Sequence, residues 1–323
     1  MPNIISCLFA WTGLDRAAAG VLGAGQTLAK QAGGKHCLLL LGAASESLLA
    51  ELSHLADSIH RADHPLLSEY HSEITLTALT QACRALQPAA VLLGNDTYSQ
   101  ELAPRLAHRL KGSAGGDALS LQLKDGAIAV TRPVYGGKAQ AIIALRRAPA
   151  VIWIRARAQQ PAQPQESAAE ILPVALALEP DERIKMISLR TESKTGELRL
   201  EDARFIVSGG RGLGGPEPFK QLQELARAMG AQMAASRAAC DAGWVPSTWQ
   251  VGQTGKKVAP ELYLAIALSG ASQHLMGIAD AKIIAAINTD KDAPIFSHCR
   301  FGLVEDYRKV VGLLQQKLSQ ASA

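Results

Sequence analysis

Short apolar segments alternate with longer amphipathic segments along the first 110 residues. The apolar segments 4–10, 36–41 and 89–94 have the length and composition of buried strands. The other segments carry apolar residues at helical spacing and are predicted to be helices: 14–32, 45–56, 74–86 and 99–111. Strands separated by helices predict an α/β fold with a mostly parallel sheet that is covered on both faces.

Antiparallel strands are predicted in the second part of this unit. Polar and apolar residues alternate at 118–124 and 127–132, on both sides of Asp125-Gly126. This dipeptide is typical of a two-residue hairpin turn. Further strands are expected at 139–145 and 150–154. The first unit is therefore predicted to be a mostly parallel sheet with antiparallel strands at its end.

Residues 159–181 are rich in proline and glutamine, which predicts an extended connector or a strand lying on the surface. A short strand is expected at 184–190. The chain has 323 residues, which exceeds the usual size of one domain. Two domains are therefore expected, one over residues 1–190 and one over residues 191–323.

The second half is predicted to be another α/β domain. Strands are expected directly before a glycine-rich turn at 208–215 and at 231–236, 262–268 and 282–287. Helices are expected through Leu222, Leu225 and Met229, at 271–276 and at about 304–318, with a long loop at 237–257. This order favours a doubly wound sheet of the flavodoxin or Rossmann type.

The glycine-rich turn has the spacing of a dinucleotide-binding motif. Gly210, Gly212 and Gly215 fit G-x-G-x-x-G, which lets a backbone approach a pyrophosphate at a helix N-terminus. The same spacing also occurs in tight turns that bind no ligand. An NAD site needs an acidic residue after the second strand, but that strand ends in Ser236-Arg237. Arg237 suits the 2′-phosphate of NADP, so an NADP-dependent reductase is an alternative.

Polar residues follow the other strands of this half as well. The loop 250–256 offers amides, a hydroxyl and glycines that suit a polar ring or a polyol, although it could also be a solvent-facing turn. Ser269 and His274 follow the third strand, and Asn288 ends the fourth. His274 could instead be a structural histidine. Because parallel strands end at one edge of a sheet, these groups are expected to converge with Gly210.

Composition excludes several classes of function. Lys and Arg number 33 against 29 Asp and Glu, and no basic run is interleaved with aromatic residues, so nucleic-acid binding is not expected. No apolar run could span a bilayer, and no secretory pattern is visible. We therefore expect no membrane insertion and a cytoplasmic location, or the mitochondrial matrix in a eukaryote.

Metal binding and hydrolysis are not expected. The five cysteines are scattered without a C-x-x-C pair. His60 and His64 have helical i,i+4 spacing, but no third ligand accompanies them. Asp96 is more simply explained as a helix N-cap, and Ser269-Gly-Ala is not a nucleophile elbow. No catalytic residue and no metal ligand is therefore assigned.

Several motifs occur in a fixed order between residues 204 and 318. They are Val207-Ser-Gly-Gly-Arg-Gly-Leu, Ala235-Ser-Arg-Ala-Ala with Asp241-Ala-Gly, Gln250-Val-Gly-Gln-Thr-Gly-Lys, Val258-Ala-Pro-Glu-Leu-Tyr, Ser269-Gly-Ala-Ser-Gln-His-Leu, Ala286-Ile-Asn and Ala293-Pro-Ile-Phe. With these motifs the region closely resembles the α subunit of electron transfer flavoproteins. The first half resembles the N-terminal domain of that family more loosely, through 101–107 and 131–137.

The resemblance implies a non-covalent FAD in the C-terminal domain. The residues that it assigns to FAD are Arg211, Ser236, Arg237, Gln250, Val251, Gly252, Gln253, Thr254, Gly255, Ser269, Gly270, Ala271, Ser272, Gln273, His274, Asn288 and Asp306. Arg211 and Ser236 would hold the phosphate region, and Arg237 would lie over the flavin ring. His274, cationic or hydrogen-bonding, would reach the flavin O2, while Asn288 and Asp306 would address the adenosine end.

The resemblance also implies partners and a role. A β subunit, which carries AMP, would contact the N-terminal domain and complete a heterodimer. The protein would be an electron carrier rather than an enzyme with its own substrate. It would take electrons from flavin dehydrogenases, as in fatty acid β-oxidation, and pass them to an acceptor such as a membrane quinone oxidoreductase. Trp244, Trp249 and the segments 113–117 and 297–301 depart from the family pattern.

Overall fold

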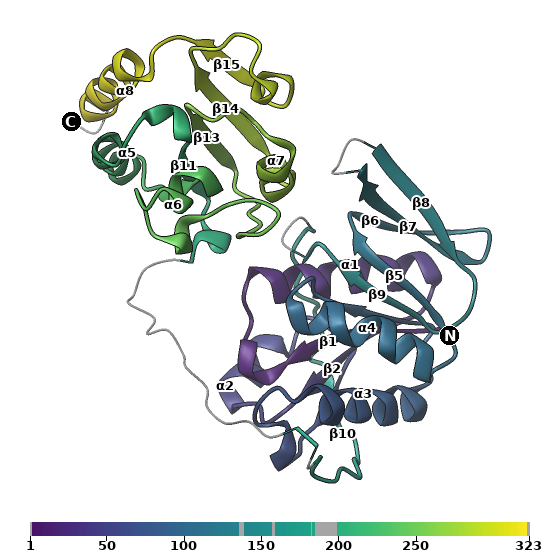
Figure 1. Ribbon diagram of the computed structural model, residues 1–323. Coiled ribbons are helices and arrows are strands. Elements are labelled where there is room, and N and C mark those ends of the chain that lie inside the picture. Colours follow the sequence, from purple (N-terminus) through teal and green to yellow (C-terminus); the bar gives the residue numbers. More distant parts are fainter. Residues whose placement is uncertain (1, 136–138, 157–158, 182, 185–198, 322–323) are drawn as a thin grey trace. The chain divides into compact units, whose positions relative to one another are not determined.

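The chain forms two compact units, Met1–Arg190 and Thr191–Ala323, which Figure 1 draws in sequence colours. The computed structural model describes residues 2–135, 139–156, 159–181, 183–184 and 199–321. The boundary expected near residue 190 lies outside the described residues, as does nearly all of the strand expected at 184–190. Each unit is an α/β structure, as the sequence predicts.

The first unit is built on a seven-stranded, fully parallel sheet with the strand order β10-β3-β2-β1-β4-β9-β5. The strands are β1 (Asn3–Phe9), β2 (Lys35–Leu41), β3 (Ser58–Ala62), β4 (Ala90–Leu93), β5 (Ser113–Ala118), β9 (Ala150–Ile154) and β10 (Glu170–Pro173). The helices are α1 (Arg16–Ala32), α2 (Glu46–Leu52), α3 (Ser72–Leu86) and α4 (Thr97–Arg109).

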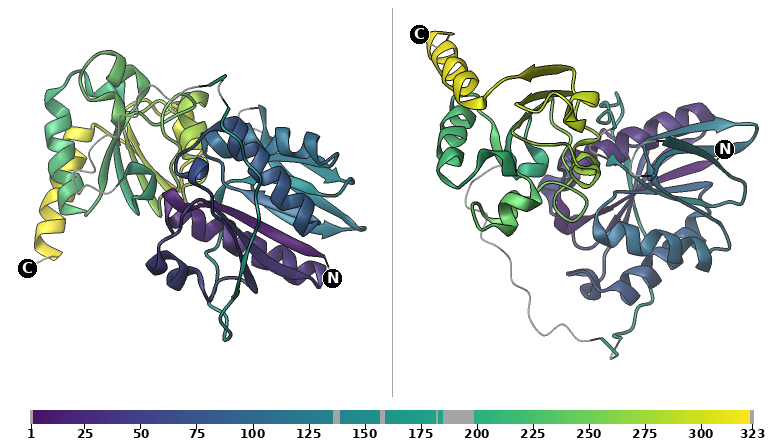
Figure 2. Two further views of the ribbon diagram at one scale, coloured as in Figure 1. Left: turned by 90° about the horizontal axis from the view of Figure 1, so that it is seen from below. Right: turned by 45° about the horizontal axis from the view of Figure 1, so that its top comes forward.

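The alternation of side chains along β1 explains why helices cover both faces of this sheet (Figure 2). Ile4 and Leu8 pack into one apolar cluster with residues of α1 and α2. Ile5, Cys7 and Phe9 point the other way and pack with residues of α3 and α4. A strand that is buried on both faces has no polar alternation, which is why these segments are uniformly apolar in the sequence.

The predicted hairpin is confirmed. It belongs to a separate three-stranded antiparallel sheet of β6 (Ser120–Lys124), β7 (Ala127–Val134) and β8 (Ala139–Leu145). Asp125 and Gly126 join the first two strands with φ angles of 50° and 71°. Two successive positive φ angles are what a type I′ turn requires.

Three predictions for the first unit were wrong in detail. The helix expected at 45–56 ends at Leu52, and residues 58–62, which carry polar side chains, form strand β3. Residues 150–154 return to the parallel sheet instead of continuing the antiparallel one. The helix expected at 99–111 already begins at Thr97, with Asp96 as its N-cap, and ends at Arg109.

The second unit contains a five-stranded parallel sheet with the strand order β12-β11-β13-β14-β15. Its strands are β11 (Phe205–Gly209), β12 (Gln232–Ala235), β13 (Leu262–Ile266), β14 (Ile283–Asn288) and β15 (Phe301–Val304). Its helices are α5 (Glu217–Ala228), α6 (Arg237–Asp241), α7 (Ser272–Ile278) and α8 (Tyr307–Ala321). Apolar clusters pack α5 and α8 on one face and α7 on the other.

Two elements of the second unit were not predicted. The segment expected to be a loop from 237 begins with the short helix α6, which Ser236 caps by accepting a hydrogen bond from the Ala239 amide. Strand β15 precedes α8, so residue 304 ends a strand instead of opening a helix. All four residues of β15 are exposed, and an exposed edge strand lacks the burial pattern that sequence analysis depends on.

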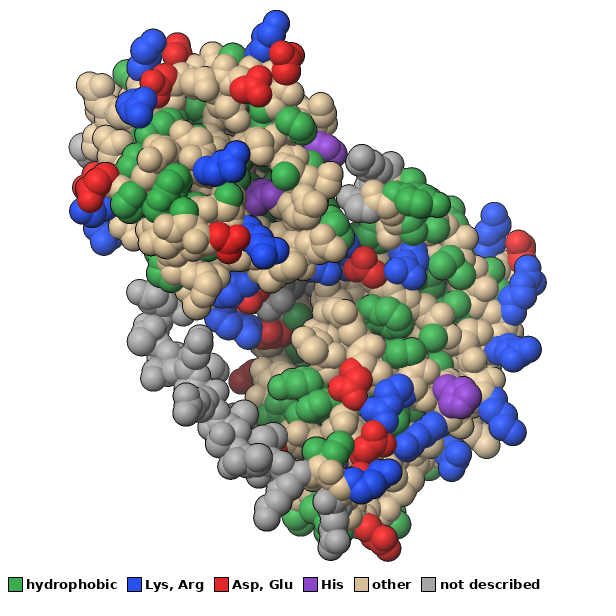
Figure 3. Space-filling model, viewed as in Figure 1, with side chains coloured by type: hydrophobic (Ala, Val, Ile, Leu, Met, Phe, Trp, Pro, Cys, Tyr) green, Lys and Arg blue, Asp and Glu red, His purple; other side chains and the backbone are tan. Residues whose placement is uncertain are grey.

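Charge is distributed without a dominant sign over most of the face shown in Figure 3, where acidic and basic side chains intermix on both units. This matches the nearly balanced composition. Among the helices that the structure describes, none has the length and apolar character needed to cross a membrane.

The buried His36 of β2 predicts that acid destabilises the first unit. Its Nε2 lies 2.9 Å from Ser6 Oγ, and burial lowers its pKa to about 4, against a smaller opposing effect of Asp57. Below pH 6.5 the unfolded chain therefore binds a proton that the folded chain rejects until about pH 4. The free energy of unfolding should fall by about 2 kcal/mol from pH 7 to pH 5 through this residue.

Urea titrations at these two pH values test this expectation. His36→Gln should flatten the dependence on pH, while the exposed His108→Gln should leave it unchanged. An equal slope in the wild type and His36→Gln would contradict the assignment.

Candidate functional site

The site expected from the sequence lies at the switch point of the second unit. From β11 the chain moves first to β12 on one side and then to β13 on the other. The carboxyl ends of β11 and β13 are therefore neighbours from which the following segments diverge. In open parallel sheets this crevice is where ligands bind. The register pairs Gly209 with Ile266, so Gly210 and Ala267 follow at the same level.

The glycines of the turn serve close packing between backbones. The Gly210 amide donates to the Ile266 carbonyl at 2.9 Å, and a Cβ on Gly210 would lie 2.1 Å from the Ala267 oxygen. A Cβ on Gly212 would lie 2.9 Å from the same oxygen, whereas one on Gly215 would meet nothing within 4 Å. The third position of G-x-G-x-x-G therefore makes no close contact. The motif-based argument for an NADP-dependent reductase loses its support.

The close approach of helix to strand, which the third glycine provides in a dinucleotide motif, depends here on Gly209. A Cβ at Gly209 would lie 2.4 Å from the ring of Phe219 in α5. This glycine precedes the predicted motif, and α5 begins only at Glu217, after a short turn at Arg211–Leu213. The sequence signal for Gly209 was the pair Gly209-Gly210, of which only the second residue fits the spacing G-x-G-x-x-G.

Two arginines and a serine lie at the ends of β11 and β12. The Arg211 side chain is exposed and makes no hydrogen bond or ion pair with any residue that the structure describes. Ser236 caps α6, and its amide donates to the Gly209 carbonyl at 3.0 Å. Arg237 is exposed and pairs with Asp241 at 3.2 Å within α6. Both guanidinium groups remain accessible to an anion.

The loop 250–256 is fixed at both of its ends. The Val251 amide donates to the Ala235 carbonyl at 3.1 Å, and the Lys256 amide donates to the Gln250 carbonyl at 2.8 Å. The Gln253 amide donates to the Gln273 carbonyl at 2.7 Å, which ties the loop to α7. The loop is therefore a built element of the sheet edge and not a free turn.

The glycines of this loop allow its close contacts. Gly252 has a φ of 148° and approaches Gln273, and a Cβ on Gly255 would lie 2.4 Å from the Gln250 oxygen. The side chains of Gln253 and Thr254 are exposed, and Gln250 Nε2 donates to Thr254 Oγ1 at 3.0 Å. Amide and hydroxyl groups are thus presented on a rigid backbone.

The segment that opens α7 exposes a row of small polar residues. Ser269, Ala271, Ser272 and Gln273 are exposed, while Gly270 is buried with a φ of 80°. The Ile295 amide donates to the Ser269 carbonyl at 3.0 Å, and a Cβ on Gly270 would lie 2.4 Å from the Ile295 nitrogen. Ile295 thus contacts the buried side of this segment, and the other side remains exposed.

His274 is buried, with 6% of its surface exposed. Its Nε2 lies 2.9 Å from the Tyr263 hydroxyl, and its Nδ1 has no hydrogen-bond partner among the described residues. Burial lowers its pKa to about 4, with a smaller opposite effect from the Val251 backbone. The imidazole is therefore neutral near pH 7, so it can form hydrogen bonds but not supply a positive charge.

His274 Nδ1 is a buried nitrogen that lacks a hydrogen-bond partner among the described residues, and a bound ligand can supply one. A buried polar group without a partner costs about 1–3 kcal/mol, so native proteins retain few of them. A flavin carbonyl that met this nitrogen would satisfy it. The exposed polar residues at the same sheet edge complete a set that fits FAD by its chemistry.

The two residues expected at the adenosine end already have backbone partners. Asn288 Nδ2 donates to the Leu268 carbonyl at 2.9 Å, and its Oδ1 accepts from the Asp290 amide at 3.0 Å. Asp306 accepts from the Arg308 amide at 2.9 Å, which is the main cause of its lowered pKa. Both residues shape turns after β14 and β15, and contact of either with adenosine stays a prediction.

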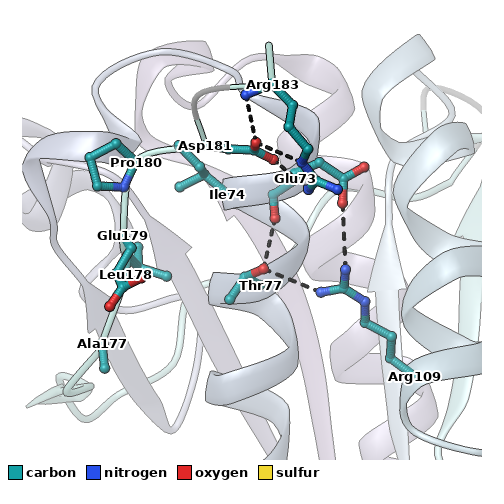
Figure 4. A pocket seen from close by; sticks show the side chains of 10 residues that line it. All are labelled: Glu73, Ile74, Thr77, Arg109, Ala177, Leu178, Glu179, Pro180, Asp181 and Arg183. Carbon is teal, nitrogen blue, oxygen red and sulfur yellow. Dashed lines mark hydrogen bonds and ion pairs between the residues drawn. The ribbon is translucent and has the colours of Figure 1, made fainter.

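A large hollow lies in the first unit, outside every element named for FAD (Figure 4). It measures about 550 Å³ and is lined by α3, by Arg109 of α4, by the segment Ala177–Asp181 and by Arg183. Two ion pairs lie within it: Glu73 lies 3.5 Å from Arg109, and Asp181 lies 2.7 Å from Arg183. No sequence motif pointed to it.

The histidines considered for a metal do not have the predicted geometry. His60 lies in strand β3, with Nε2 3.1 Å from Ser58 Oγ, so it does not share a helix face with His64. His64 Nδ1 accepts a hydrogen bond from the Leu66 amide. Within the described ranges no three His, Cys, Asp or Glu side chains gather as metal ligands.

Comparison with known families matches both units. Residues 12–178 match the family model described as the electron transfer flavoprotein domain, and residues 199–279 match the one described as the electron transfer flavoprotein FAD-binding domain. The first match alone covers more than half of the chain. The chain belongs to the electron transfer flavoprotein α-subunit family.

Individual relatives of this family agree over nearly the full length. Electron transfer flavoprotein subunit alpha of Thermoanaerobacterium thermosaccharolyticum is 36% identical over 95% of this chain and 94% of the relative. Protein FixB of Clostridium saccharobutylicum is 33% identical over 92% of this chain and 90% of its own. The α subunit of Bacillus subtilis is 34% identical over 87% of each chain.

The match to the FAD-binding domain covers most of the expected FAD residues but not all of them. Residues from Arg211 to His274 lie within the match to the FAD-binding domain, whereas Asn288 and Asp306 lie beyond its end. Sequence analysis also missed two buried hydroxyl groups: that of Tyr263 on β13, which contacts His274, and that of Ser208 on β11. A hydroxyl inside an otherwise apolar strand was the available signal.

The difference between Gly210 and Gly215 can be tested by substitution. Gly210→Val places a side chain against the Ala267 backbone, so the free energy of unfolding should fall by about 1–3 kcal/mol or more. Gly215→Val meets open space and should change it by no more than about 0.5 kcal/mol. Urea titration of both variants measures the two effects. Equal losses would support the dinucleotide motif instead.

Proposed function

We propose that this chain is the FAD-carrying α subunit of a heterodimeric electron transfer flavoprotein. It takes electrons from flavin dehydrogenases and passes them to an acceptor such as a membrane quinone oxidoreductase. The observations that carry the proposal are a buried His274 Nδ1 without a partner among the described residues and exposed polar residues that follow the neighbouring strand ends, inside the region that matches the FAD-binding domain. Family membership supports the same conclusion.

Each part of the sheet edge offers chemistry that suits one part of FAD. Arg211 and the exposed Ser269 and Ser272 suit the phosphates, since guanidinium and hydroxyl groups bind phosphate oxygens. Arg237 suits the electron-rich flavin ring, and Gln253 and Thr254 of the fixed loop suit its polar edge or the ribityl chain. Ser236, Val251 and Gln273 are among the remaining members of the expected set, and their backbones hold these elements in place.

FAD, when bound, supplies the redox chemistry, since it accepts and releases electrons one at a time or in pairs. The protein residues bind and orient it and adjust how readily it accepts charge. His274 offers a buried hydrogen-bond donor, and Arg237 offers a nearby positive charge. Fixed donors in surroundings of low polarity act strongly on negative charge because they need no reorganisation.

A β subunit that carries AMP is part of this proposal. The three-stranded sheet of the first unit exposes large apolar side chains: Tyr135 at 83%, Ile142 at 75% and Ile143 at 40%. Figure 3 shows hydrophobic side chains where β8 lies. Exposed apolar groups of this size favour contact with a protein partner. The bacterial relatives favour a cytoplasmic location for the complex.

Absorption spectroscopy tests the proposal directly. The chain, purified together with its β subunit, should be yellow and should release FAD on denaturation because the cofactor is not covalently bound. Addition of NADPH to the FAD-free complex should leave tryptophan fluorescence unchanged. A complex that stays colourless after incubation with excess FAD refutes the proposal.

Reductive titration tests the roles of His274 and Arg237. His274→Ala removes a buried donor and Arg237→Ala removes a charge, so both should weaken stabilisation of the first added electron, by about 1–3 kcal/mol for the donor. Both variants should keep the fold, judged by circular dichroism. Lys220→Ala, on the exposed side of α5, is the matched control. Unchanged midpoint potentials in both site variants would contradict their placement.

A further inference from the structure

A buried hydrogen bond joins His274 of α7 to Tyr263 of β13. Tyr263 is fully buried, and its hydroxyl lies 2.9 Å from His274 Nε2. The two rings are inclined at 58° with their centroids 6.0 Å apart, so they meet through their polar edges and are not stacked. None of the contacts proposed for FAD involves this tyrosine.

Only one direction of this hydrogen bond leaves the tyrosine satisfied. Burial raises the pKa of Tyr263, so it remains a phenol with one hydrogen to donate. Ser208 on the neighbouring strand lowers that pKa, which is the effect of a hydroxyl that donates toward the phenol oxygen and does not accept its hydrogen. If the Tyr263 oxygen accepted a hydrogen bond from Nε2–H, the tyrosine's own hydroxyl hydrogen would have no acceptor in the core.

Tyr263 therefore donates to Nε2, which must then be the unprotonated nitrogen of the ring. His274 is neutral because burial lowers its pKa to about 4. A neutral imidazole carries one proton, and with Nε2 accepting, that proton lies on Nδ1. Nδ1 is the nitrogen that has no partner among the described residues.

We propose that Tyr263 is a positioning residue for the flavin site, because its hydroxyl fixes His274 as the Nδ1–H tautomer. This inference rests on the proposed function. It adds that the histidine meets the cofactor as a neutral donor whose direction the core of the domain determines. The opposite tautomer would present a lone pair to the flavin carbonyl and repel it.

The sheet explains how the tyrosine can impose this state. Tyr263 pairs with Ile206 and Ile284 on the neighbouring strands, so its position is fixed from both sides. His274 is held by the first turn of α7, where its amide donates to the Ala271 carbonyl at 2.9 Å. The hydrogen bond thus joins two rigid elements, and the tautomer does not depend on a mobile loop.

Two conservative substitutions separate the effect of the Tyr263 hydroxyl from the effect of its surroundings. Tyr263→Phe removes the hydroxyl and keeps the ring. Ser208→Ala is the matched control, since it removes a neighbouring buried hydroxyl from the same face of the sheet and leaves both partners of the Tyr263–His274 hydrogen bond in place. If Tyr263 acted through Ser208, the control would have the larger effect.

Nitrogen NMR of the full chain without cofactor measures the tautomer directly. The His274 signals are identified by their loss in His274→Gln. We expect Nδ1 to be protonated in the wild type and in Ser208→Ala, and the tautomer ratio to shift roughly fivefold in Tyr263→Phe through the loss of one hydrogen bond. Protonated Nε2 in the wild type overturns the inference, and this result requires only the assignment variant His274→Gln to fold.

Potentiometry of the FAD-loaded chain with its β subunit tests the consequence. Tyr263→Phe should lower the midpoint potential for the first electron, and Ser208→Ala should not. In a His274→Gln background Tyr263→Phe should have no further effect, because the tyrosine acts through the histidine. An equal shift in that background overturns the inference. Failure of the wild type to bind FAD would refute the proposed function, whereas the tautomer measurement would still stand.

Discussion

The candidate site depends on how closely two neighbouring strand ends approach each other. Gly210 lies against the Ala267 backbone so tightly that no side chain fits between them. This contact brings the turn after β11 and the segment before α7 to one level of the sheet. The arginine at 211 and the serines at 269 and 272 are presented together only because this approach is possible. A substitution here would change the site without touching any group that binds a ligand.

The same principle of backbone support extends across the whole edge of the sheet. The loop 250–256 is fixed to Ala235 and Gln273 through amide-to-carbonyl hydrogen bonds, and Ile295 supports Ser269 in the same way. Side chains of the expected FAD set are therefore free to face outward, because the backbone and not the side chains holds the segments together. Asn288 and Asp306 are the exceptions, since their side chains form local turns. They contribute to the architecture of the edge whatever else they contact.

Sequence patterns predicted the parallel strands and most helices because burial on both faces leaves uniformly apolar segments such as β2 and β4. They failed at β3 and β15, where strands carry polar or exposed residues and are recognised only through their hydrogen-bonded neighbours. The convergence of strand ends was predictable from topology alone. The neutral state of His274 was not, because it depends on burial of the ring. Tyr263, which contacts that ring, looks in the sequence like any other aromatic side chain in an apolar strand. Spacing of glycines misled the analysis, since distance along the chain does not reveal which backbone lies opposite.

A histidine without charge has a consequence for the electron carrier as a whole. A cationic donor would gain and lose its proton within the range of pH that cells experience, and the energy of the added electron would vary with it. With a pKa of about 4, the imidazole stays in one protonation state from mildly acidic to alkaline conditions. Burial of this ring thus removes the titration of His274 as a source of pH dependence in the redox level of the proposed site. Any variation of the carrier's driving force with pH would then come from the flavin and from other groups, and not from this histidine.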